Sequence, residues 1–145
     1  MKIKRILQVF GLVIAGSFAV LAGCQSMAPM TGAQTVALTG ANEVPAVTTT
    51  ATGTATVAIK DDRSVSVQVT TTGMTPTASH IHMGAVGVNG PVIVPFTKTG
   101  DNTFASAPDA KLTEEQYAAY KAGNLYVNVH SAKNPGGEIR GQIKG

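Results

Sequence analysis

The chain has 145 residues, with 11 lysines and arginines, eight aspartates and glutamates, one cysteine and no tryptophan. Three of the basic residues lie within the first five positions, which leaves eight basic residues against eight acidic ones in the rest of the chain. This balance, without any later basic cluster, excludes a broad surface for nucleic acid. A single cysteine excludes an internal disulfide, so the fold must depend on core packing.

The first 23 residues have the pattern of a secretory signal peptide. Lys2, Lys4 and Arg5 precede an apolar run that is too short and too rich in glycine for a comfortable membrane span. The run ends in LAGC, which resembles the bacterial lipobox. This resemblance implies cleavage before Cys24, acylation of its sulfur, for example with palmitate, and a membrane anchor outside the cytoplasm. The alternative is ordinary signal cleavage beside an idle thiol.

The residue after the cysteine bears on the destination of the chain. Gln25, rather than aspartate, resembles the pattern for export to an outer membrane, at its periplasmic face or at the cell surface, in a cell with two membranes. Residues 24–34 are small and polar, with proline and glycine, and predict a lipidated cysteine followed by a flexible tether. Residues 35–145 then suit one domain.

Alternation with a period of two predicts most of the domain to be β-strand. The expected strands are 34–40, 53–60, 64–73, 78–84, 91–100, 102–108, 124–131 and 137–145. The exception is 113–122, where Thr113 is a credible N-cap and Gly123 supplies a stop, so a short helix is expected there. About seven or eight antiparallel strands with one short helix indicate an all-β Greek-key sandwich or barrel.

The phase of two strands predicts a meeting of all three histidines. In SHIHMG, Ile81 should face the core, which sends His80 and His82 to the same outer face, about 6.6 Å apart along the strand. In LYVNVHS the inward set is apolar, so His130 also faces outward. If the strands are neighbours, the three rings form a nitrogen site for copper or zinc. The alternative is three ordinary polar residues on a solvated face.

The same phases predict the surroundings of this site. Tyr126, Asn128, Glu138, Arg140 and Gln142 are expected on the outer, solvated face. Asn128, Glu138 and Arg140 could orient the histidines from a second shell. A wet sheet face, an ion pair or hydrogen bonds to the adjacent turn explain them equally well.

Two further residues of metal-binding type have simpler explanations. Met83 has the phase of Ile81 and is expected to fill the core. Glu43 is expected to fix a turn or to pair with an arginine on a neighbouring strand.

The motifs ALTGANEVPAV, ASHIHMG and LYVNVHS followed by NPGGEIRGQ resemble the CHRD domain, a chordin-type module found in many bacterial secreted proteins. The resemblance covers roughly residues 35–144 and implies an extracytoplasmic β-sandwich. The pair His80 and His82 is also similar to the copper-binding pair of Cu/Zn superoxide dismutase, with Arg140 in the place of the arginine near the copper. Too few histidines remain for a second metal, which leaves one copper site of His80, His82 and His130.

The sequence therefore predicts a cell-envelope lipoprotein that binds a transition metal, with copper favoured over zinc. One alternative is a module whose exposed sheet faces bind another envelope protein or polymer without a metal. The other is a single-copper, dismutase-like enzyme in which Arg140 guides the anion. No catalytic residue is assigned, because the chain has neither a nucleophile motif nor a phosphate-binding loop.

Overall fold

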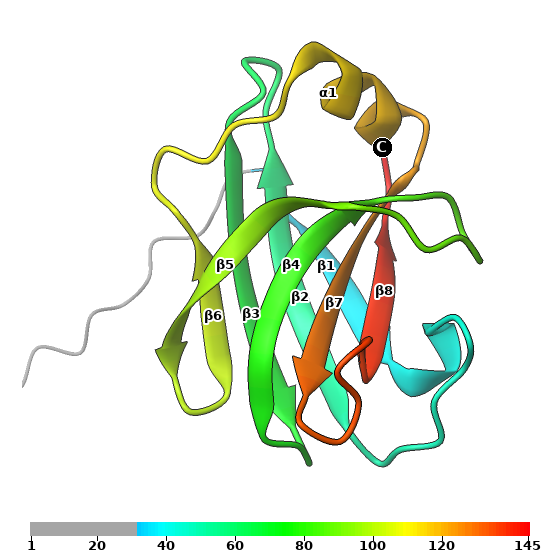
Figure 1. Cartoon of the computed structure of the whole chain (residues 1–145). Helices are drawn as coiled ribbons and strands as arrows, with labels where there is room; N and C mark the ends of the chain where they lie inside the picture. The colour runs from blue at the N-terminus through cyan, green and yellow to red at the C-terminus, as the bar shows by residue number, and fades with distance from the viewer. Residues whose placement is uncertain (1–31) are drawn as a thin grey trace, which may run out of the picture.

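The computed structural model describes residues 32–145, which form a closed barrel of eight antiparallel strands with one short helix (Figure 1). The strands are β1 (Gln34–Thr39), β2 (Thr52–Ile59), β3 (Val65–Thr72), β4 (Pro76–Met83), β5 (Val92–Gly100), β6 (Thr103–Ser106), β7 (Leu125–Ser131) and β8 (Ile139–Ile143). A 3-10 turn, η1 (Gly40–Asn42), follows β1, and the helix α1 (Glu114–Lys121) lies between β6 and β7. The predicted signal peptide, Cys24 and most of the tether lie outside the described residues.

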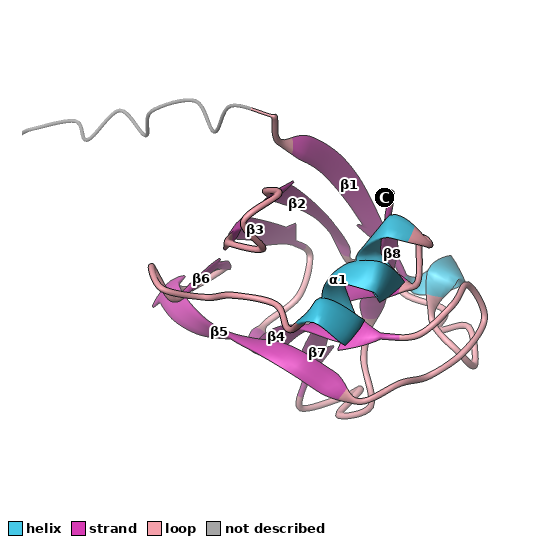
Figure 2. Ribbon diagram, turned by 90° about the horizontal axis from the view of Figure 1, so that it is seen from above, coloured by secondary structure: helices cyan, strands magenta, loops and turns pink. Residues whose placement is uncertain are grey.

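The order of strands around the barrel is β1-β2-β3-β6-β5-β4-β7-β8. Strands β4, β5 and β6 are paired in succession, while β3 lies beside β6 and β7 lies beside β4. This arrangement is a Greek key, and it confirms the predicted all-β class. Seen from above, the strands surround one interior and α1 lies over part of its end (Figure 2). The long connection from β6 to β7 thus brings the two histidine-bearing strands together.

The core follows the predicted inward phases. Val65, Val67 and Val69 of β3 are buried, as are Ile81 of β4 and Ile139 of β8. Burial of each such side chain contributes about 1.5–3 kcal/mol, which explains how a chain without tryptophan or a disulfide forms a stable domain. Met83 packs against this core cluster, as the sequence predicted.

Helix α1 lies over part of one end of the barrel. Thr113 accepts a hydrogen bond from the backbone of Gln116 and donates its own backbone N–H to the Gln116 side chain, which forms a capping box. Tyr117 and Tyr120 of the helix pack against the core cluster. Within residues 32–145, no helix is long and apolar enough to cross a membrane.

One expectation about the outer face is wrong. Tyr126, Asn128, Glu138 and Arg140 do not contribute to the core cluster, yet their exposed fractions are only 2%, 2%, 6% and 1%. Gln142 is half-buried. The reason is that the loop between β4 and β5 (residues 84–91) and the segment 43–51 fold over this part of the barrel and hydrogen-bond to it. The alternating pattern predicts on which face of a strand a side chain lies, but it does not predict whether another segment of the chain covers that face.

Candidate metal centre

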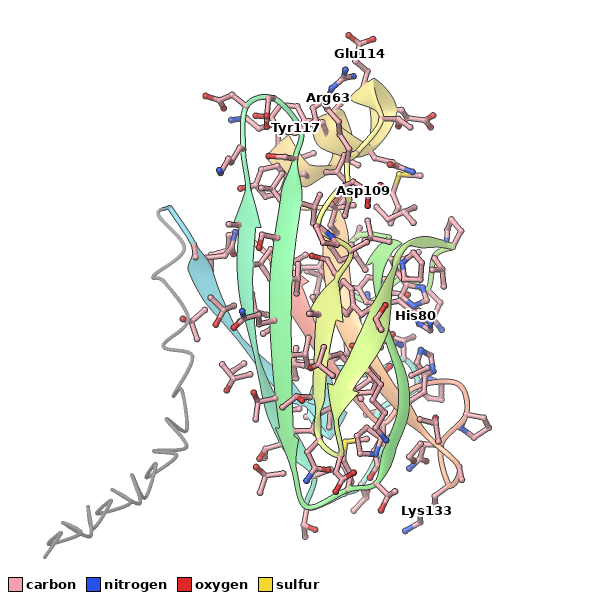
Figure 3. The ribbon with its side chains drawn as sticks, turned by 90° about the vertical axis from the view of Figure 1, so that its left-hand side faces the viewer. Arg63, His80, Asp109, Glu114, Tyr117 and Lys133 are labelled. Atoms are coloured by element: carbon pink, nitrogen blue, oxygen red, sulfur yellow. The ribbon has the colours of Figure 1, made fainter. Side chains whose placement is uncertain are left out.

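The pairing of β4 with β7 brings the three histidines together on the outside of the barrel. In this register His80 lies opposite Asn128, His82 opposite Tyr126, and His130 opposite Ala78. His80 Nδ1 is 3.0 Å from His130 Nε2, and one nitrogen from each of the three rings lies within 4.8 Å of the others. Figure 3 shows the His80 side chain projecting away from the barrel interior. The predicted convergence is confirmed.

Backbone carbonyls fix the proton positions of two rings. His82 Nδ1 lies 2.8 Å from Gly90 O, and His130 Nδ1 lies 2.9 Å from Pro135 O. Because a carbonyl oxygen only accepts, both Nδ1 atoms carry the proton, and in a neutral ring Nε2 then presents a lone pair. Metal-ligating histidines commonly donate their second ring N–H to a backbone carbonyl in this way.

The spacing of two of the nitrogens fits a transition metal ion. Two ligands at about 2.0–2.1 Å from one ion, with an angle between a right angle and a tetrahedral one, lie about 2.9–3.4 Å apart. The 3.0 Å between His80 Nδ1 and His130 Nε2 matches this range. His82 Nε2 is buried without a hydrogen-bond partner. Leaving such a group unpaired costs about 1–3 kcal/mol, and a cation at the centre of the cluster would satisfy it.

The protonation of the rings favours the ligating form. Burial, together with the nearby His130 and His82 rings, lowers the pKa of His80 to about 4. Burial also lowers the pKa of His82, although its hydrogen bond with Gly90 acts in the opposite direction. Both rings are therefore neutral at neutral pH, which is the form that binds a metal. Three imidazoles without a thiolate suit copper and zinc.

Arg140 holds the β4–β5 loop in place beside the histidines. Its guanidinium donates hydrogen bonds to Ala85 O (3.2 Å), Val88 O (2.9 Å) and Asn89 Oδ1 (3.1 Å). The guanidinium carbon also lies 3.4 Å from the centre of the Tyr126 ring, a cation–π geometry. The predicted arginine thus contacts the loop that covers the site.

Tyr126 links the loop to His82. Its ring stacks on the His82 ring, with the planes 8° apart and the centroids separated by 4.9 Å. Its hydroxyl accepts a hydrogen bond from Gly90 N at 3.1 Å. Gly90 is thereby held at both ends of its backbone: its N–H donates to Tyr126, and its carbonyl accepts from His82.

The carboxylate of Glu138 forms its hydrogen bonds with residues other than the three histidines. It accepts hydrogen bonds from Thr49 Oγ1 (2.7 Å) and from the Ser131 hydroxyl. Burial acts to raise the pKa of Glu138, but these hydrogen bonds hold it below its usual value. The contacts anchor the turn before β8, and an orienting role of Glu138 toward the histidines stays a prediction.

Sequence reasoning missed Gly90 and Pro135 as parts of the site, and it placed Tyr126 beside the site without predicting its contacts with His82 and Gly90. The first two contribute backbone carbonyls, which leave no signal in the residue type. Tyr126 shares its outward phase with His130, and this was the one available indication.

These features define a class, a small Greek-key β-barrel with a candidate three-histidine metal centre on its outer wall. The family model of the CHRD domain matches residues 34–143. The chain therefore belongs to the CHRD domain family, as its motifs suggested. No curated protein and no solved structure matches the chain.

Proposed function

We propose that this protein binds a transition metal ion, preferentially copper, through His80, His82 and His130. The observation that carries the proposal is the buried, unpartnered Nε2 of His82 in a cluster where one nitrogen from each of the three rings lies within 4.8 Å of the others. Bound copper would supply a redox-active or exchangeable cation. The proposed role is metal binding or handling at the cell envelope, where the acylated Cys24 would hold the domain at a membrane.

The preference for copper rests on ligand chemistry. A site of neutral imidazoles accepts both copper and zinc, but the general order of divalent affinities places Cu²⁺ above Zn²⁺. Three histidines leave at least one position open for water, a further ligand or transfer to a partner.

Calorimetric titration of the purified protein with Cu(II), Cu(I) and Zn(II) tests the proposal. We expect tight copper binding at one site, weaker zinc binding, and loss of both in the variant that combines His80→Ala, His82→Ala and His130→Ala. Met83→Leu is the matched control, because Met83 neighbours His82 but packs against the core, and it should leave the affinity unchanged. Equal, weak binding by the wild-type protein and the triple variant would end the proposal.

A second candidate is an interaction module that binds another envelope protein. It is favoured by three exposed valines, Val86, Val88 and Val92, with exposed fractions of 78%, 52% and 47%. All three lie in or next to the β4–β5 loop, and Val92 pairs with His82 between β4 and β5. Apolar side chains gathered on a surface are typical of interaction sites. Absence of metal binding in the titration would make this candidate the leading one.

The third hypothesis, single-copper dismutation, has no supporting observation. Arg140 was expected to guide the anion, but it is 1% exposed and its guanidinium is hydrogen-bonded to the β4–β5 loop. A copper-loaded sample should consume superoxide no faster than the same copper in buffer.

A further inference from the structure

Three buried side-chain atoms within residues 32–145 have no hydrogen-bond partner, and they belong to Glu43, His82 and Asn128. Native proteins leave few such atoms, so each one calls for a physical explanation. A metal ion would explain His82 Nε2. It does not by itself explain Asn128 Oδ1 or Glu43 Oε1.

The side chain of Asn128 lies between the other two residues. A Cβ placed on Gly137 would be 2.8 Å from Asn128 Nδ2 and 2.6 Å from Glu43 Oε1, so the amide nitrogen and the carboxylate oxygen pack against the same glycine. Gly137 has φ of 131°, a conformation that side chains rarely allow. The glycine therefore leaves room for both side chains beside it, and no hydrogen bond joins Glu43 Oε1 to Asn128 Nδ2 in this structure.

The other end of the Asn128 carboxamide faces the histidine. Burial lowers the pKa of His82, and the Asn128 side chain acts to raise it. An amide oxygen beside the ring has this effect, because it stabilises the protonated imidazole. Because Gly90 O already engages His82 Nδ1, the nitrogen next to Asn128 Oδ1 is Nε2. With an amide oxygen beside it, His82 Nε2 receives no hydrogen bond and keeps its lone pair free for a metal ion.

The opposite orientation of the amide would block the site. An Asn128 side chain turned by half a rotation would donate from Nδ2 to His82 Nε2 and occupy the lone pair that a metal needs. The availability of His82 as a ligand therefore depends on which end of the amide faces it. A group next to the other end of the carboxamide must therefore determine whether Oδ1 or Nδ2 faces His82.

We propose that Glu43 is a positioning residue for the metal centre: its carboxylate, which only accepts hydrogen bonds, attracts the nitrogen end of the Asn128 amide and so turns the oxygen end toward His82. This inference rests on the proposed function, because it matters only if His82 binds a metal. A protonated Glu43 can donate to the oxygen end instead, so the selection weakens when the carboxyl group takes up a proton.

The surroundings of Glu43 place that protonation near neutral pH. Burial raises the pKa of Glu43 to about 7, against the opposing effects of the Arg140 charge and of a hydrogen bond from the Val44 backbone. Glu138 follows Gly137 in the chain; its carboxylate is held by Thr49 and Ser131, and the Lys133 charge acts on it. Residues 84–91, which include the neighbouring Val86 and Gly87, carry no charge.

The first test needs no metal. Heteronuclear NMR of the full protein should show the Asn128 side-chain NH2 signals titrating with a midpoint near the pKa of Glu43, and this titration should disappear in Glu43→Gln. Glu115→Gln, the same change on the exposed face of α1, should leave it intact. If the signals ignore both pH and Glu43→Gln, the inference is overturned whether or not the protein binds a metal.

The second test is a double-mutant cycle on metal affinity. Glu43→Gln should weaken Cu(II) binding about tenfold at pH 8 and have less effect at pH 6, a magnitude typical of residues that orient a ligand. In an Asn128→Ala background, Glu43→Gln should have no further effect, because the side chain that transmits its influence is gone. An equal effect in both backgrounds would mean that the Glu43 charge acts directly, which contradicts the inference. Absence of copper binding by the wild-type protein would instead reject the proposed function.

Discussion

Replacement of Arg140 by lysine should loosen the cover of the metal centre without removing the positive charge. The guanidinium serves three acceptors on the β4–β5 loop, at 2.9–3.2 Å, and its exposed fraction is 1%. A lysine ammonium at the same position is a point charge on a flexible stem and can keep about one of these contacts. Each lost hydrogen bond to a charged group is worth about 1.5–3 kcal/mol. Two of them would therefore give about 3–6 kcal/mol.

Water should recover part of this free energy, because Val88 and Asn89 lie at the surface. We therefore expect Arg140→Lys to lower the free energy of unfolding of the metal-free protein by about 2–4 kcal/mol. Urea unfolding measures this value, with the slope against urea concentration unchanged.

The control is Lys98→Met, which removes a cation that donates to Pro76 O from an exposed position. It should cost about 1 kcal/mol or less. A loss below about 1 kcal/mol for Arg140→Lys would refute the assignment of Arg140 as the residue that holds the loop.

Three further predictions concern the same region. Gly90→Ala should lower stability by about 2–4 kcal/mol in urea unfolding, because a Cβ there would lie 1.7 Å from Met83 O and displace the carbonyl that holds His82; an unchanged midpoint would contradict this. The pKa of Glu43 is about 7 in the folded protein against 4.5 in a model compound, so the wild type should lose stability relative to Glu43→Gln as pH rises from 4.5 through 7. Unfolding of both proteins at pH 5.5 and pH 8 measures this difference, and an unchanged difference would contradict it. The pKa of His80 is about 4 in the folded protein against 6.5 in a model compound, so the wild type should lose stability relative to His80→Gln as pH falls from 6.5 toward 4. Parallel pH profiles of the two proteins would contradict the lowered pKa.

The sequence predicted the strands and the phases of their side chains because both follow from a period of two. The inward valines of β3, the core position of Met83 and the capped helix α1 all agree with the structure. The outward phase of His80, His82 and His130 was enough to predict their convergence only on the condition that their strands are neighbours. Period and phase do not encode which strands pair, and the Greek-key order of the barrel supplied that condition.

The environment of the site could not be predicted from local patterns. Arg140 and Asn128 were expected in solvent, but segments distant in the sequence cover them. Gly90 contributes a backbone carbonyl, for which any residue type would give the same signal. Glu43, which lies in the β1–β2 connection, reaches Gly137, a contact between residues 94 positions apart that no periodicity reveals.

The central claim, that three histidines bind one metal ion, is tested most directly by electron paramagnetic resonance of the protein loaded with one equivalent of Cu(II). We predict hyperfine structure from three imidazole nitrogens in the wild-type protein and from two in His130→Ala. A spectrum that matches copper in buffer, or one that is unchanged when all three histidines are replaced by alanine, would contradict the claim.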